Sequence, residues 1–165
     1  MKSLIYCSSA TLVLRFDDKV ENCAKTTGSI DMDWEVLQEG EEEAYLNGTW
    51  RILSDIKAPL PLKLYTRKFE SGEWSEISLK RSVPDFCALI HSPLEVWHSI
   101  TKDVPKCPWK KGAVIEFNMV PLSFAGLQMT RALEGEWKVF MDAYYSVKGV
   151  KKDLCMILKL DVVDF

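Results

Sequence analysis

Apolar and polar residues alternate along most of this chain, and the alternation is most regular between residues 134 and 162. One set of alternate positions is apolar on both arms of this stretch: Trp137, Val139, Met141, Ala143, Tyr145, Leu154, Met156, Leu158, Leu160 and Val162. The positions between them include Lys138, Asp142, Lys159 and Asp161. A period of two predicts strands. We therefore expect strands over 138–146 and 154–163, joined by a basic turn at 148–152 and buried on one face.

Shorter segments with the same alternation recur along the chain and are bounded by turn residues. They span residues 11–20, 30–37, 44–55, 62–69, 74–83 and 113–120. In the second of them, one face carries Ile30, Met32, Trp34 and Val36. Short strands at such intervals, each with one apolar face, predict an all-β antiparallel sandwich or barrel.

Residues 84–101 break this pattern. Their apolar positions Phe86, Ile90, Leu94 and Trp97 are about four residues apart, a spacing typical of a helix. Ser92 and Pro93 suit a helix start, because serine caps free amides and proline fits the first turn, and Glu95 can complete a capping box. We expect one or two short helices inserted between the strands.

A chain of 165 residues is long enough for one well-packed domain and short for two. It has no repeat of fixed period and no low-complexity linker, so we expect a single domain over residues 11–165. Residues 1–10 have two interpretations. One lysine, an apolar stretch and the small residues Ser8, Ser9 and Ala10 resemble a remnant of a secretory signal. The alternative is a native first strand preceded by a few disordered residues.

Charge and motifs exclude several functions. The net charge is −3 and the basic residues are scattered, so we expect no nucleic-acid partner. The sequence has no G-x-S-x-G elbow, glycine-rich phosphate loop, H-E-x-x-H motif or Rossmann fingerprint. The acidic run at 39–43 lacks the alternating ligands of a calcium loop. We therefore expect no catalysis, no cofactor and no metal.

The five cysteines lie at positions 7, 23, 87, 107 and 155. Cys87 and His91 are four residues apart, which raises two hypotheses: a zinc site and a Cys-His nucleophile. Paired CxxC motifs are absent and Cys87 lies in an apolar run, so we favour a disulfide between Cys87 and Cys107. Cys23 and Cys155 would then form a second bridge. Free thiols and other pairings remain alternatives.

Two further features bear on the compartment. If Cys7 belongs to a signal segment, an even number of cysteines remains, as a secreted protein requires. Asn47 begins an N-glycosylation sequon, Asn-Gly-Thr. Together they indicate an oxidising compartment and a secreted protein.

The remaining apolar residues of the C-terminal half allow two interpretations. They are Trp97, Trp109, Phe117, Met119, Leu122, Phe124, Leu127 and Met129. Methionine and aromatic side chains usually fill a core, but they also line enclosed cavities for apolar ligands. Composition alone does not separate these alternatives.

The order of several motifs resembles a known family. The motifs are an early Cys23 after a strand, Asp85-Phe86-Cys87-Ala88 before a tryptophan-bearing helix, Cys107-Pro108 with a later Gly112, Leu133-Glu134-Gly135-Glu136-Trp137-Lys138, and Lys151-Lys152-Asp153-Leu154-Cys155. Over residues 11–163 the chain resembles the ML lipid-recognition superfamily. The resemblance is strongest to its insect branch, which includes the chemosensory B proteins and is similar to the ganglioside activator protein.

The resemblance implies an immunoglobulin-like β-sandwich whose sheets splay around a lipid-sized cavity. It also implies secretion, and disulfides that match Cys23 with Cys155 and Cys87 with Cys107. The insect branch implies expression in chemosensory tissue and a role in sensing cuticular hydrocarbons or other lipids.

We therefore predict a secreted, monomeric, non-catalytic protein that binds a lipid or another small hydrophobic molecule. The residues expected near its cavity are Trp97, Phe124, Met129, Met141 and Leu158. The alternative is a protein-interaction module of the same fold, with a filled core and a loop surface that contacts a receptor or channel. Transient contact with a membrane fits the first interpretation.

Overall fold

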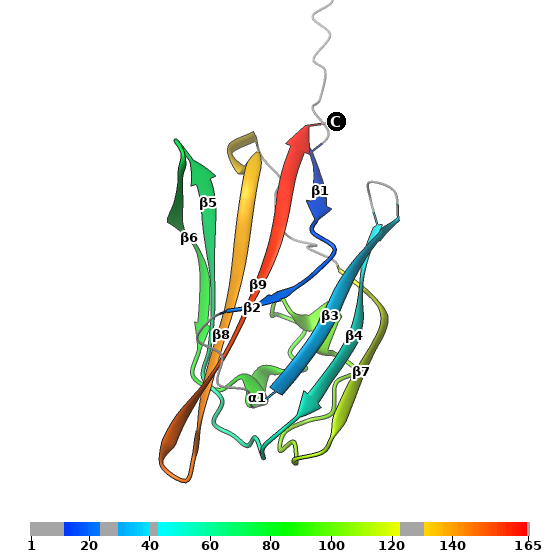
Figure 1. The fold of residues 1–165 in the computed structure, drawn as a ribbon, viewed down its shortest axis with the longest axis vertical. Helices are drawn as coiled ribbons and strands as arrows, with labels where there is room; N and C mark the ends of the chain where they lie inside the picture. Colours follow the sequence, from blue (N-terminus) through cyan, green and yellow to red (C-terminus); the bar gives the residue numbers. More distant parts are fainter. Residues whose placement is uncertain (1–11, 24–29, 40–42, 123–130, 165) are drawn as a thin grey trace, which may run out of the picture.

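The computed structural model describes residues 12–23, 30–39, 43–122 and 131–164. Its strands form two antiparallel sheets that pack face to face, which confirms the all-β sandwich (Figure 1). The strands are β1 (Leu12–Phe16), β2 (Glu21–Asn22), β3 (Ile30–Glu39), β4 (Glu43–Ile52), β5 (Leu62–Glu70), β6 (Glu73–Val83), β7 (Val114–Pro121), β8 (Gly135–Val147) and β9 (Val150–Asp164). The larger sheet has the order β1-β9-β8-β5-β6, with β2 also paired to β9, and the smaller sheet has the order β3-β4-β7.

The β8–β9 hairpin forms the middle of the larger sheet, and its apolar face points toward the smaller sheet. The register pairs Met141 with Met156 and Ala143 with Leu154. Lys148 and Gly149, at the tip, both have positive φ. This conformation suits a two-residue hairpin turn, whose twist matches that of the strands. The predicted inner face is therefore confirmed, but the turn is shorter than the predicted 148–152.

The smaller sheet buries the apolar face that the alternation in β3 predicts. Ile30, Met32 and Val36 are all less than a tenth exposed. In the row through the middle of this sheet, Gly48 of β4 lies between Trp34 of β3 and Phe117 of β7. The pairing of β4 with β7 shifts register beside Gly48, which marks a β-bulge.

The predicted single strand over 11–20 is wrong, because this segment pairs with both sheets in turn. β1 and β2 both pair with β9 of the larger sheet. Between them the chain reaches β3: the Val20 amide donates to the Trp34 carbonyl at 3.4 Å, and the Val36 amide donates to the Asp18 carbonyl at 2.8 Å. The crossing divides the strand because one run of residues cannot stay in register with two separate sheets.

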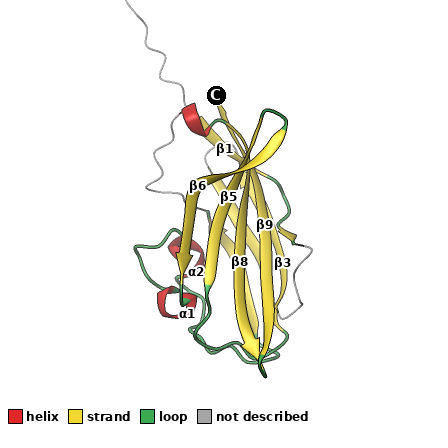
Figure 2. Cartoon of the chain, turned by 90° about the vertical axis from the view of Figure 1, so that its left-hand side faces the viewer, coloured by secondary structure: helices red, strands yellow, loops and turns green. Residues whose placement is uncertain are grey.

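Two short helices interrupt the strands, α1 (Phe86–Leu89) and α2 (His98–Thr101). Figure 2 shows them beside β6. The predicted helix start at Ser92 is wrong, since residues 93–97 form turns and a bend instead. The Glu95 carboxylate binds the Arg81 guanidinium of β6 through two hydrogen bonds, at 2.6 and 3.1 Å, and this contact raises the pKa of Arg81. Leu94, expected on the apolar face, is 92% exposed.

The half-buried Asp85 is the N-cap residue of α1. The Asp85 carboxylate accepts from the Cys87 amide at 3.1 Å and from the Leu60 amide at 3.0 Å. Replacing Asp85 with alanine should lower the free energy of unfolding by about 1–2 kcal/mol, because both amides lose their acceptor. Chemical denaturation of Asp85→Ala beside Asp85→Asn checks this, since asparagine keeps one acceptor oxygen. Equal losses in the two variants would contradict the capping role.

Both predicted disulfides are present. Cys23 is bonded to Cys155, with their Cα atoms 5.2 Å apart, and Cys87 is bonded to Cys107, with their Cα atoms 5.6 Å apart. The first bridge ties the segment after β2 to β9, and the second ties α1 to the segment before β7. Cys87 therefore has no free thiolate for the zinc or nucleophile hypotheses.

Candidate ligand cavity

An apolar cavity of about 160 Å³ lies between the two sheets. The larger sheet contributes Leu62, Leu64, Val139, Met141, Met156 and Leu158. The smaller sheet contributes Trp34, Leu46 and Trp50, and the helical segment contributes Phe86, Val96, Trp97, Ile100 and Thr101. Val20 and Leu122 complete the described lining. Val96 is 62% exposed, so the cavity reaches the surface at the helical segment.

Strand register explains why these side chains meet. Leu64, Met141 and Met156 occupy one row across three neighbouring strands, β5, β8 and β9, so their side chains share one face of the larger sheet. Trp34 and Trp50 project from the facing sheet, and their rings stack with centroids 5.1 Å apart. The cavity wall is thus a direct product of alternation in both sheets.

Three of the predicted cavity residues lie on this wall: Trp97, Met141 and Leu158. Phe124 and Met129 lie outside the described residues. The prediction missed Trp34, Trp50 and Phe86. Trp34 already stood on the predicted apolar face of residues 30–37, so the signal for its burial was present, but nothing in the alternation distinguishes a cavity wall from a packed core.

The described cavity is smaller than the lipid-sized hollow that the resemblance implies. A cavity of about 150 Å³ lined by aliphatic and aromatic groups accommodates one benzene molecule, whereas typical ligand pockets span about 300–1,000 Å³. The reason is the bulk of the inner-face aromatics: the Phe117 ring contacts both Trp34 and Trp50 edge-on, with each pair of centroids 5.0 Å apart. Large rings therefore occupy much of the space between the sheets.

The wall is almost entirely apolar. Among its described residues, Thr101 is the only one with a hydroxyl group, and none carries a formal charge. The Thr101 hydroxyl donates a hydrogen bond shared between the Ile90 and Trp97 carbonyls. The Trp97 indole donates to the Leu89 carbonyl at 3.1 Å. These contacts tie α2 and the turn before it to the end of α1 within the helical segment.

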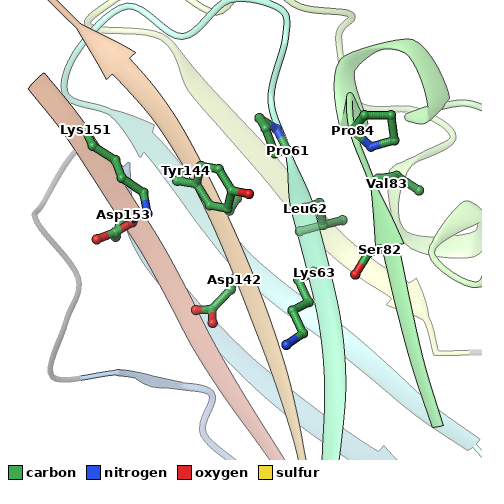
Figure 3. Close-up of a pocket in the computed structure, with 11 residues that line it drawn as sticks. Pro61, Leu62, Lys63, Ser82, Val83, Pro84, Asp142, Tyr144, Lys151 and Asp153 are labelled. Atoms are coloured by element: carbon green, nitrogen blue, oxygen red, sulfur yellow. Dashed lines mark ion pairs between the residues drawn. The ribbon is translucent and has the colours of Figure 1, made fainter. Parts of the chain in front are cut away.

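A second hollow, of about 630 Å³, lies on the outer face of the larger sheet (Figure 3). Its polar lining residues are Lys63, Ser82, Asp142, Tyr144, Lys151 and Asp153. The Lys151 ammonium lies 3.8 Å from the Asp153 carboxylate and 4.4 Å from the Tyr144 ring centroid. Burial raises the pKa of the neighbouring Tyr65, and the Asp142 carboxylate acts in the same direction. Charges of both signs line this surface, and no single ligand chemistry is favoured.

The other candidate residues lie away from the cavity. Asn47 sits in β4 beside the bulge, where its side chain donates to Glu35 and accepts from the Met119 amide, both at 3.4 Å. Its glycosylation stays a prediction. The His91 imidazole contacts the Val104 carbonyl. Cys23, Asp142 and Cys155 lie close enough together to hold a metal, but the two cysteines are already bonded to each other.

No protein-family model and no curated protein matches the sequence of this chain. The likeness to the ML superfamily and the immunoglobulin-like connectivity therefore stay predictions from the motifs. Within the described residues, no helix combines the length and apolar character needed to cross a bilayer.

Proposed function

We propose that this protein binds a small apolar ligand, or the end of a longer one, in the cavity between its sheets. The observation that carries the proposal is a cavity wall with hardly any polar surface, built from both sheets and the helical segment. Apolar pockets with few polar groups are typical of binding sites for hydrophobic small molecules. The described residues line a cavity suited to about six or seven non-hydrogen atoms, by comparison with benzene.

Burial of apolar groups supplies the affinity. At about 0.8 kcal/mol for each methylene group, six buried carbons contribute about 5 kcal/mol, which corresponds to a dissociation constant of order 0.1–1 mM. A longer lipid would place its end in the cavity, and the rest of its chain would leave beside Val96. The wall accounts for affinity without any catalytic group.

The extracellular location and the chemosensory role of the protein are also proposals. Two disulfides are compatible with an extracellular protein. The motifs shared with the insect branch of the ML superfamily favour secretion and a role in chemosensation, with a hydrocarbon-rich ligand. The proposed ligand class is based on the cavity, whereas the proposed expression in chemosensory tissue is based on the resemblance alone.

Filling the cavity tests the proposal. Benzene should raise the melting temperature of the wild-type protein, by about 5–10 °C at one hundred times the dissociation constant. Met141→Trp, which places a larger side chain on the cavity wall, should abolish this shift, and Leu158→Phe should reduce it. Differential scanning calorimetry measures both effects.

Val150→Trp is the matched control, because Val150 is 57% exposed at the hairpin tip. This variant should respond to benzene as the wild type does. Absence of any ligand-dependent shift in the wild-type protein would contradict the proposal and favour the protein-interaction module with a filled core.

A further inference from the structure

The turn that joins the two short helices forms the outer border of the cavity. Among the described lining residues, Val96 is the only exposed one, and Leu94, two residues earlier, is 92% exposed. On either side of the turn the chain enters the core, since Ile90 is 1% exposed and Trp97 is 6% exposed. Residues 92–96, the flap, therefore lie at the surface between two fixed ends.

The flap has few polar contacts with the rest of the fold. Its backbone hydrogen bonds are local: the Ser92 amide donates to the Leu89 carbonyl at 3.1 Å, and the Glu95 amide donates to the Ser92 carbonyl at 3.3 Å. Within the part of the chain that the structure describes, one polar contact joins the flap to a sheet. It is the ion pair between Glu95 and Arg81 of β6.

Strand register places Arg81 at the border of the cavity. One row of paired residues crosses β6, β5, β8 and β9, and its members are Arg81, Leu64, Met141 and Met156. The last three line the cavity. Paired residues on neighbouring strands share a face of the sheet, so Arg81 extends the cavity row to the edge strand. There its guanidinium meets the Glu95 carboxylate.

The two partners of this ion pair differ in exposure. The Arg81 side chain is 51% exposed, whereas the Glu95 side chain is 8% exposed. The Glu95 carboxylate has thus lost most of its contact with water, and the two hydrogen bonds from Arg81 replace that water. Loss of the guanidinium would leave a nearly buried charge unpaired, and outward movement of the flap would return this charge to water.

We propose that the flap is a gate over the cavity and that the Arg81–Glu95 ion pair is its latch. When the pair breaks, the flap turns outward between its fixed ends, and a ligand enters or leaves beside Val96. This inference rests on the proposed function and adds the route of ligand exchange. The latch controls the rate of exchange rather than the affinity, because the closed state still predominates and the bound ligand contacts the same wall.

Exchange kinetics of a small probe test the gate. The ¹⁹F NMR line shape of fluorobenzene, titrated into the intact protein, gives its dissociation rate and its dissociation constant. Glu95→Gln removes the charge but keeps one acceptor oxygen, so dissociation should become about 3-fold faster. Arg81→Met leaves the Glu95 carboxylate unpaired, so dissociation should become about 10-fold faster. Both dissociation constants should stay within about twofold of the wild-type value.

Glu21→Gln is the matched control. Glu21 of β2 accepts a hydrogen bond from Lys159 of β9 at 3.0 Å, and neither residue lines the cavity. The substitution removes the same charge from an ion pair outside the flap, so both the dissociation rate and the dissociation constant of fluorobenzene should equal those of the wild type.

Amide hydrogen exchange follows the flap without any ligand. The His98 amide donates to the Glu95 carbonyl at 3.1 Å, across Trp97 at one end of the flap. Outward rotation at this end breaks that bond, so the His98 amide should exchange about 10-fold faster in Arg81→Met. The amides in the middle of β8 should exchange as in the wild type.

The outcomes separate the gate from the proposed function. If fluorobenzene does not bind the wild-type protein, the proposed function fails, and the gate fails with it. If fluorobenzene binds but Arg81→Met changes neither its dissociation rate nor the exchange of the His98 amide, the gate is overturned and the proposed function stands. A dissociation constant that rises in step with the dissociation rate would also overturn the gate, because the substitution would then have damaged the wall itself.

Discussion

Replacing Cys23 and Cys155 with alanine should lower the free energy of unfolding by about 5 kcal/mol. The bridge closes a loop of 132 residues, almost the whole described chain, and the entropy that a cross-link removes from the unfolded state grows with loop length. A loss of this size is large against the 5–15 kcal/mol typical of a folded domain. Denaturant unfolding at equilibrium measures it.

The second bridge is the control for this prediction. Cys87 and Cys107 are separated by only 20 residues, so the Cys87→Ala/Cys107→Ala variant should lose about 3 kcal/mol. The order of the two losses is the diagnostic result. A greater loss for the shorter loop would show that local packing of α1, rather than chain entropy, dominates the effect of the bridges.

Gly48→Ala should also be strongly destabilising, by about 3–5 kcal/mol. Gly48 has a φ of +143°, and a Cβ atom built there would lie 1.9 Å from the Asp33 carbonyl oxygen of the neighbouring strand. That oxygen belongs to the backbone, so β3 itself would have to move. Because Trp34 is the register partner of Gly48, the cavity should lose ligand affinity as well. Chemical denaturation of Gly48→Ala measures the loss of unfolding free energy, and titration of the same sample with benzene measures the loss of ligand affinity.

Gly72→Ala is the matched control for the bulge. Gly72 also has a positive φ, +81°, but a Cβ atom there would meet nothing within 4 Å. The free energy of unfolding of Gly72→Ala should be lower than that of the wild type by about 1 kcal/mol, from backbone strain alone. If both variants lost similar unfolding free energy, β3 would be able to move away from the new Cβ atom at position 48 at no cost in stability.

Alternation predicted the sheets well because it is local information. Side-chain direction repeats every two residues in a strand, so the faces of Trp34, Met141 and Leu158 followed from their neighbours in sequence. The helix start at Ser92 failed because a competing contact was invisible in the sequence. Glu95 binds Arg81 of β6, fourteen residues earlier, instead of capping a helix.

The cavity itself could be predicted only in part. Which residues face inward depends on alternation, but whether they touch depends on the distance between two sheets that are remote in sequence. Among the described residues, the buried indole nitrogens of Trp34 and Trp50 have no hydrogen-bond acceptor, and this could not be predicted, because it depends on where backbone carbonyls lie in three dimensions.

The segment that crosses between the sheets before β2 also shields an edge. An unpaired edge strand offers free amides and carbonyls to other chains and is a common origin of aggregation. Asp18 and Val20 occupy those groups on β3 near Trp34 and Val36. At an edge of the larger sheet, β6 carries Lys80 and Arg81 and a break in register, two further devices that discourage intermolecular strand pairing. The sandwich thus protects two of its borders without closing into a barrel, which favours a protein that stays dispersed at high concentration.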